Sequence, residues 1–163
     1  MIEKEVIDNY LSEDEFDFVK NSLLDINFYW GFMPSSISGE NAQLVHLLCD
    51  PITGFTSPHS QKIITPIIEK LNPSALLKVK SNLQWQRDEI IEDPLHVDFI
   101  NVQATTSILY MNTCNGYTYF RDGSKVDSVA NRMVTFPTQT PHAGANCTDQ
   151  DYRIVINFNY HKY

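Results

Sequence analysis

The first feature of this sequence with chemical potential is the pair His96 and Asp98, separated by one residue. Side chains at positions i and i+2 of a β-strand point to the same face of a sheet. An imidazole nitrogen and a carboxylate oxygen placed in this way can bind the same metal ion. Because a His-x-Asp pair also arises by chance in a chain of this length, the pair predicts a metal site only if further ligands exist elsewhere.

Two later residues supply such partners. His142 follows Asp98 by 44 residues, and Arg153 follows His142 by another 11. Two histidines and one carboxylate on a β scaffold form the facial triad, which leaves coordination positions open on a non-haem Fe(II) ion. The planar guanidinium of an arginine binds a carboxylate through two parallel hydrogen bonds. Together these residues predict a metal site with an acidic co-substrate beside it.

Short β-strands are the elements that must position these residues. From about residue 78 the pattern has a period of two, and the dipeptides Asn115-Gly116 and Asp122-Gly123 predict tight turns. Strand-like segments cover residues 78–85, 104–111, 117–120, 132–136 and 152–160. Several short strands with no helical pattern between them favour an antiparallel barrel or a jelly roll.

The N-terminal part has a helical pattern instead. Ser12 and Glu15 form a capping-box motif before apolar residues spaced by three and four, which predicts a helix over about residues 13–25. A second helix is expected at about residues 60–71, although Pro66 limits its regularity. These helices are expected to lie on one side of the β core.

Glycine and proline interrupt residues 27–60, which are therefore expected to form irregular loops. We expect a single domain over residues 1–163, because the chain shows no internal repeat and no linker-like segment. Within it, residues 1–75 would be helical and irregular, and residues 78–160 would form the mainly β jelly-roll core.

Charge and cysteine content limit the classes of partner. The chain has a net charge of −8, and residues 1–25, with eight acidic and two basic side chains, contribute most of it. No cluster of Lys and Arg is present, which disfavours a nucleic-acid partner or an anionic membrane surface. Three widely spaced cysteines and the lack of a signal-peptide pattern predict reduced thiols, a cytoplasmic location and no secretion.

The ordered motifs resemble those of the 2-oxoglutarate/Fe(II)-dependent dioxygenases. The blocks HVDF, ILYMN, GYTYFRDG, NRMVTFP, PHAG and RIVINF are similar to the prolyl-4-hydroxylase-like branch, especially its small viral or phage-borne members. The resemblance covers about residues 78–160, with a looser similarity in VIDNYLSEDEFD near the N-terminus. It implies a double-stranded β-helix core, which is the jelly-roll or cupin-like fold.

The resemblance implies three iron ligands, which are His96, Asp98 and His142. It also implies that Arg153 binds the distal carboxylate of 2-oxoglutarate and that the Tyr110 hydroxyl shares this contact. Asn82 lies near the position of a polar contact to the co-substrate in that branch. Asn157 is expected to face the same pocket, because it lies four residues after Arg153 on one strand.

The activity implied by the resemblance is hydroxylation of an unactivated C–H bond with Fe(II), 2-oxoglutarate and O2, giving succinate and CO2, with ascorbate as reductant. The acceptor would be peptidyl, with proline favoured, or a small molecule, selected by loops such as 27–60 and 86–95. Two alternatives remain open. One is a nucleic-acid demethylase, disfavoured because Asn159 stands where that branch has a second arginine. The other is a non-catalytic metal-binding jelly-roll module.

Overall fold

The computed structural model describes residues 3–34 and 42–163, and its main feature is a large antiparallel sheet. The strand order is β1-β9-β6-β11-β5-β3-β2, and β4 pairs with β3 at one edge. These strands are β1 (Glu5–Ile7), β2 (Gly31–Met33), β3 (Gln43–Asp50), β4 (Gly54–Phe55), β5 (Ala75–Trp85), β6 (Thr105–Tyr110), β9 (Met133–Pro137) and β11 (Tyr152–His161). The long strands β5 and β11 pair at the centre of the sheet.

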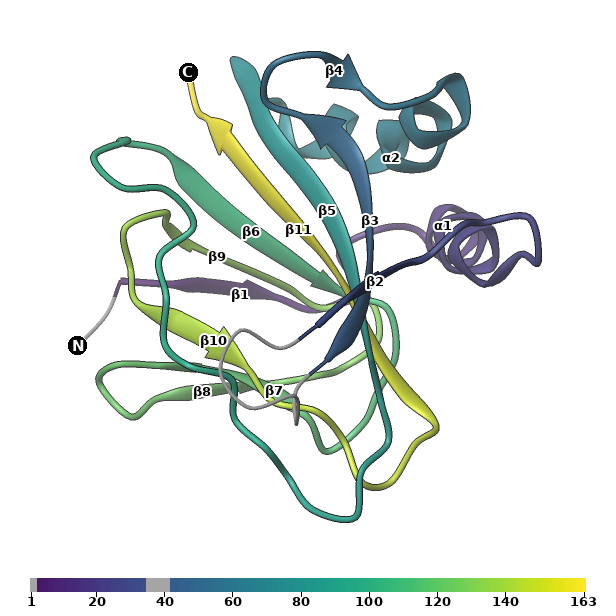
Figure 1. Ribbon diagram of the computed structural model, residues 1–163. Coiled ribbons are helices and arrows are strands. Elements are labelled where there is room, and N and C mark those ends of the chain that lie inside the picture. The colour runs from purple at the N-terminus through teal and green to yellow at the C-terminus, as the bar shows by residue number, and fades with distance from the viewer. Residues whose placement is uncertain (1–2, 35–41) are drawn as a thin grey trace.

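A smaller sheet lies across one face of the large sheet, and two helices lie on the opposite face of the large sheet (Figure 1). The small sheet has the order β10-β7-β8, and its strands are β7 (Tyr117–Phe120), β8 (Lys125–Asp127) and β10 (His142–Gly144). The helices are α1 (Glu13–Leu24) and α2 (Pro58–Leu71). This mainly β architecture with helices on one side agrees with the sequence-based expectation.

Local sequence signals explain the ends of both helices. The Ser12 side chain accepts a hydrogen bond from the backbone of Glu15, and the Glu15 carboxylate accepts one from the backbone N–H of Ser12, so the predicted capping box forms. The second helix begins two residues earlier than expected, because Ser57 is its N-cap and Pro58 occupies its first turn. It ends at Asn72, whose left-handed backbone (φ 46°) lets its N–H bond the Ile68 carbonyl.

The expectation of irregular loops over residues 27–60 is wrong for much of that segment. Strands β2, β3 and β4 all lie within it, and eight-residue β3 pairs with central strand β5. The Gly and Pro residues mark the ends of these strands and the turn at 51–54, whereas the apolar run Leu44–Leu48 forms the strand itself. The N-terminal part therefore completes the large sheet; residues 35–41 of the segment lie outside the described residues.

The two faces of the large sheet have separate hydrophobic clusters. On the helix side, Ile156 and Phe158 of β11 are fully buried in a cluster with Val19, Ile63 and Ile67 of the helices. Between the two sheets, a smaller cluster contains Ile108, Tyr110, Phe120, Val126, Val134, Phe136 and Val155. The helix side is thus the main core, and the space between the sheets keeps room for polar groups.

Within the described ranges, neither helix has the length and apolar character needed to cross a lipid bilayer.

Candidate metal centre

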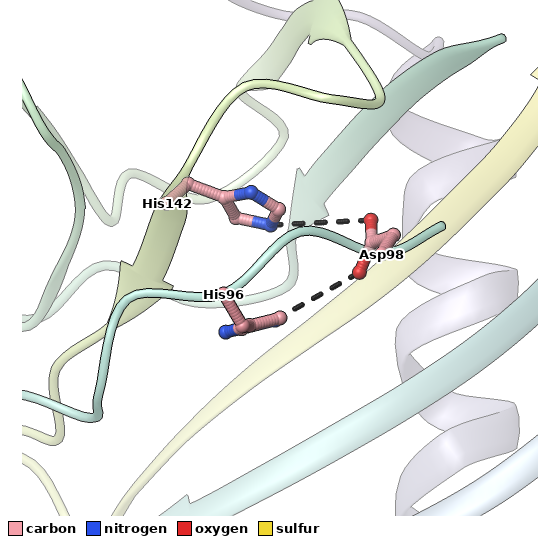
Figure 2. A group of neighbouring side chains, drawn as sticks. All are labelled: His96, Asp98 and His142. Atoms are coloured by element: carbon pink, nitrogen blue, oxygen red, sulfur yellow. Dashed lines mark ion pairs between the residues drawn. The ribbon is translucent and has the colours of Figure 1, made fainter. Parts of the chain in front are cut away.

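The structure brings His96, Asp98 and His142 together at one end of the space between the sheets. One candidate ligand atom from each residue lies within 4.8 Å of the others. The His96 Nε2 atom lies 3.8 Å from Asp98 Oδ1, and the His142 Nε2 atom lies 3.9 Å from Asp98 Oδ2 (Figure 2). Two imidazole nitrogens and one carboxylate are the donor set of a facial-triad Fe(II) site, so these residues fit a first-row divalent metal.

Backbone pairing holds the two histidines opposite each other. The N–H groups of His96 and His142 each donate to the other residue's carbonyl at 3.0 Å, which forms an isolated antiparallel bridge. The His142 Nδ1 atom lies 2.9 Å from the Thr140 carbonyl and donates to it. This contact leaves Nε2 unprotonated and directed at Asp98, as a metal-binding histidine requires.

Asp98 does not lie in a strand, which corrects the expectation that His96 and Asp98 share a strand face. Pairing stops after His96, and the chain then bends, so the carboxylate reaches the site from a loop. Its position is fixed by hydrogen bonds to Oδ2 from Thr106 Oγ1 at 3.0 Å and from Asn159 Nδ2 at 2.7 Å. Convergence therefore depends on tertiary contacts and not on strand periodicity.

The electrostatics of the site favour a charged carboxylate and neutral imidazole. Burial tends to raise the pKa of Asp98, but His142 and the hydrogen bond from Asn159 outweigh it and hold that pKa below its usual range. Burial lowers the pKa of His142, and Asp98 only partly offsets this effect. Metal ligation needs an ionised carboxylate and neutral imidazoles, and these pKa shifts favour the ionised form of Asp98 and the neutral form of His142.

Arg153 is buried in the same cleft, with 3% of its surface exposed. Its Nη1 atom donates to Gln84 Oε1 at 3.2 Å, and its Nη2 atom donates to Thr118 Oγ1 at 3.3 Å. Among the described residues it forms no ion pair, and its Nε atom has no hydrogen-bond partner. A buried guanidinium without an anion is costly, so this group fits a carboxylate ligand.

Glycine is required beside this arginine. A Cβ atom at Gly116 would lie 2.6 Å from Arg153 Cδ and 2.6 Å from the Asn146 carbonyl oxygen. A Cβ atom at Gly144 would lie 3.3 Å from Arg153 Nη1. The turn dipeptide Asn115-Gly116 therefore has a second use, because its glycine lets the backbone pack directly on the side chain of Arg153.

The other residues expected at the site lie at different depths. Asn82 and Asn157 line the cleft, and the Oδ1 atom of each is buried and accepts no hydrogen bond from the residues that the structure describes. Tyr110 is fully buried behind Thr118, with its hydroxyl donating to Thr118 Oγ1 at 2.8 Å. The Arg153 Cζ atom lies 5.5 Å from the centre of the Tyr110 ring. Tyr110 thus contacts the same hydroxyl as Arg153 without lining the cleft itself.

Sequence reasoning missed four residues that position the site. Thr106 and Asn159 hold Asp98, whereas Gln84 and Thr118 hold Arg153. Asn159 lies on the same face of β11 as Arg153, so the period of two could have identified it. Gln84 pairs with Arg153 across the sheet, and this contact required knowledge of the β5–β11 register.

A second group of potential metal ligands consists of Cys114, Cys147 and Asp149. Both thiols are buried, and burial together with Cys114 raises the pKa of Cys147 to about 11. A protonated thiol binds metals poorly. Of the two groups, the His–Asp–His group therefore has the protonation state that suits a divalent metal.

No family model matches the sequence, and no curated protein matches it. Solved structures do match over nearly the whole chain. A prolyl hydroxylase from Trichoplax adhaerens, in complex with a hypoxia inducible factor peptide fragment, aligns with a TM-score of 0.70 and 14% identity, covering 98% of this chain and 83% of that one. An oxidoreductase of the 2OG-Fe(II) oxygenase family from Burkholderia pseudomallei aligns with a TM-score of 0.72 and 8% identity, covering 98% and 85%.

The fold is that of the 2OG-Fe(II) oxygenases. This result confirms the predicted jelly-roll core and the predicted resemblance of the chain to prolyl hydroxylases. The same fold occurs in the epimerase SnoN in complex with Fe3+, alpha ketoglutarate and nogalamycin RO, with a TM-score of 0.66, 14% identity and coverage of 99% of this chain and 79% of that one. The fold therefore serves more than one reaction, and function must be argued from the site.

Proposed function

We propose that this protein is a 2-oxoglutarate- and Fe(II)-dependent dioxygenase that hydroxylates an unactivated C–H bond. The observation that carries the proposal is the presence, in one cleft, of a His–Asp–His group and a buried arginine that forms no ion pair with the described part of the chain. The first fits Fe(II), and the second fits the distal carboxylate of 2-oxoglutarate. The match in fold to 2OG-Fe(II) oxygenases supports the same conclusion.

In this proposal each residue has a defined task. His96, Asp98 and His142 hold Fe(II), which supplies activation of O2 coupled to conversion of 2-oxoglutarate into succinate and CO2. Arg153 binds the distal carboxylate of 2-oxoglutarate, and Tyr110 orients Thr118 beside it. Asn82 and Asn157 present acceptor atoms to ligands in the cleft. Ascorbate serves as the reductant that keeps the metal in the Fe(II) state.

The acceptor is proposed to be a peptidyl residue, with proline favoured, or a small molecule. A peptide accompanies the similar prolyl hydroxylase from Trichoplax adhaerens, which supports the peptidyl case. A nucleic-acid acceptor is disfavoured, because Asn159 binds Asp98 where a second arginine would be needed, and because the chain is acidic overall.

The test is to incubate the purified protein with Fe(II), ascorbate and 2-oxoglutarate and to measure succinate. We expect succinate formation by the parent protein and its loss in His142→Ala. The exposed residue His59 provides a matched control, and His59→Ala is expected to retain the activity. Absence of turnover with a broad panel of acceptors, together with equal iron binding by the parent and His142→Ala, would contradict the proposal and favour a non-catalytic module.

A further inference from the structure

The cleft contains a second cation that the proposed function leaves without a task. Lys80 of β5 lines the cleft with Asn82, Gln84 and Arg153. Its side chain is half-buried, and it forms no hydrogen bond or ion pair with any described residue. An ammonium that is partly withdrawn from water is stabilised by a nearby anion, so the position of Lys80 favours a negatively charged ligand.

Lys80 and Arg153 mark opposite ends of the cleft. Gln84 pairs with Arg153 across the sheet, whereas Lys80 pairs with Asn157 four residues further along β11. At about 3.3 Å per residue, the two levels are about 13 Å apart along the strand. Asn157 Nδ2 lies 3.4 Å from Asp98 Oδ2, so Lys80 lies at the level of the metal centre. An anion at Arg153 and an anion at Lys80 thus occupy different parts of the cleft.

The surroundings of Lys80 also favour an anion. Burial lowers the pKa of Lys80 and the neighbouring Lys78 lowers it further, whereas Asp98 partly opposes both effects. A carboxylate ligand would restore the stability of the charged ammonium. Asp98 itself is committed to Thr106 and Asn159 and to the metal centre, so among the described residues no carboxylate forms an ion pair with Lys80.

We propose that Lys80 binds a carboxylate of the oxygen-accepting substrate at the metal end of the cleft, so that the acceptor is a small organic acid. This inference rests on the proposed function and, of its two acceptor classes, selects the small molecule over the prolyl peptide. The cleft has a volume of about 420 Å³, which is in the range of sites for small ligands. Lys80 would align the acid so that its C–H bonds face the metal, and an uncharged acceptor would lose this contact.

The first experiment compares the parent with Lys80→Gln, using Lys62→Gln at an exposed position of α2 as a matched control away from the cleft. Succinate formation is measured with a panel of small carboxylic acids, with their primary amides and with proline-containing peptides. We expect the parent to prefer acids over amides, and Lys80→Gln to reduce kcat/KM for the acids about tenfold or more, as expected for loss of a charged hydrogen bond. Lys62→Gln should match the parent within about twofold.

The carboxylate at Lys80 could belong to the oxygen-accepting substrate or to the co-substrate 2-oxoglutarate. The affinity for 2-oxoglutarate distinguishes these two cases. It is measured on Mn(II)-loaded protein, and we expect Lys80→Gln to bind 2-oxoglutarate as the parent does. A tenfold loss of that affinity in Lys80→Gln would overturn the proposal, because it would assign Lys80 to the co-substrate. A parent protein that turns over peptides and amides as readily as acids would overturn it too.

A second readout does not depend on turnover. Reductive methylation of lysines, followed by peptide mass spectrometry, measures how accessible Lys80 is relative to the exposed Lys62 of α2. We expect small acids that act as acceptors to protect Lys80 at least threefold, and their amides not to protect it. Absence of turnover with intact protection would defeat the proposed function but retain an acid-binding site at Lys80, whereas equal methylation with and without acids would defeat the site.

Discussion

The two faces of the large sheet differ sharply although they share the same strands. In β11, Ile154, Ile156 and Phe158 point toward the helices and lie in the main hydrophobic cluster. The intervening residues point toward the small sheet, and they are Arg153, Val155, Asn157 and Asn159. The strand is buried along almost its whole length on both sides, so the contrast is one of polarity and not of exposure.

Buried polar atoms without hydrogen-bond partners explain the difference in polarity between the two faces of the large sheet. The buried side-chain atoms that lack hydrogen-bond partners in the described part of the chain are Asn82 Oδ1, Arg153 Nε, Asn157 Oδ1 and Asn159 Oδ1. All four belong to residues on the cleft face. Burying such atoms lowers the stability of a fold. The helix side therefore provides the stability, and the cleft side retains polar groups for ligands at the expense of stability.

The largest expected effect is on stability and comes from the helix side. Phe158 is fully buried against the helices, so Phe158→Ala should lower the free energy of unfolding by about 3–5 kcal/mol through lost burial and the resulting cavity. Urea denaturation followed by circular dichroism measures this change. A loss below about 1 kcal/mol would show that the helix side does not carry the main core.

The next effect is on ligand binding and comes from the cleft side. Arg153→Met should weaken 2-oxoglutarate binding by about tenfold or more, because a charged hydrogen-bonding group is lost. The free energy of unfolding should not decrease, since a buried cation that forms no ion pair with the described residues is replaced by an apolar side chain. Calorimetric titration of 2-oxoglutarate and urea denaturation test both parts, and unchanged 2-oxoglutarate affinity would remove Arg153 from the binding site.

A smaller effect is expected from a residue that only positions a ligand. Asn159 donates to the Asp98 carboxylate at 2.7 Å, and loss of such a supporting contact typically lowers metal affinity by about 10–100-fold. Asn159→Ala should give the lower end of this range, because Thr106 still holds the same oxygen. Competitive Fe(II) titration with a chelator is the measurement. Thr65→Ala on an exposed face of α2 is the control and should leave metal affinity unchanged.

The smallest effect is a pH dependence of the metal-free protein. Burial lowers the pKa of His142 below its ordinary value of 6.5. The unfolded state therefore binds a proton before the folded state does, and stability falls as the pH drops below about 6.5, by at most about 1.4 kcal/mol per pH unit. Urea denaturation at pH 7.5 and 5.5 should show this loss in the parent and a smaller one in His142→Gln. Equal losses in both proteins would contradict the assignment.

The sequence predicted five of the seven strands after residue 75, because period-two patterns and turn dipeptides are local signals, but it missed the three-residue strands β8 and β10. The segment Tyr117–Phe120 was located without error between its two turns. Strand β3 was missed because glycine and proline near its ends hid its short apolar run, and its pairing with β5 is a long-range contact. Local patterns report on neighbours in the chain, not on partners across a sheet.

The site was predictable to a similar degree. The types and order of His96, Asp98, His142 and Arg153 were enough to group them, and the structure places all four around one cleft. The reason given for the first pair was wrong, since Asp98 lies in a bend and is held by Thr106 and Asn159. Supporting contacts of this kind depend on register between distant strands, which one sequence does not reveal.

The alternation of side chains along β11 also determines where the protein tolerates insertions and deletions. Removing one residue within Ile154–Phe158 would shift every later side chain to the opposite face, so that Asn157 would meet the helices and Phe158 the metal centre. Point substitutions in this strand alter one face at a time, whereas a single-codon deletion damages folding and ligand binding together. Insertions and deletions among relatives are therefore expected in the turn at 121–124 and not in this strand.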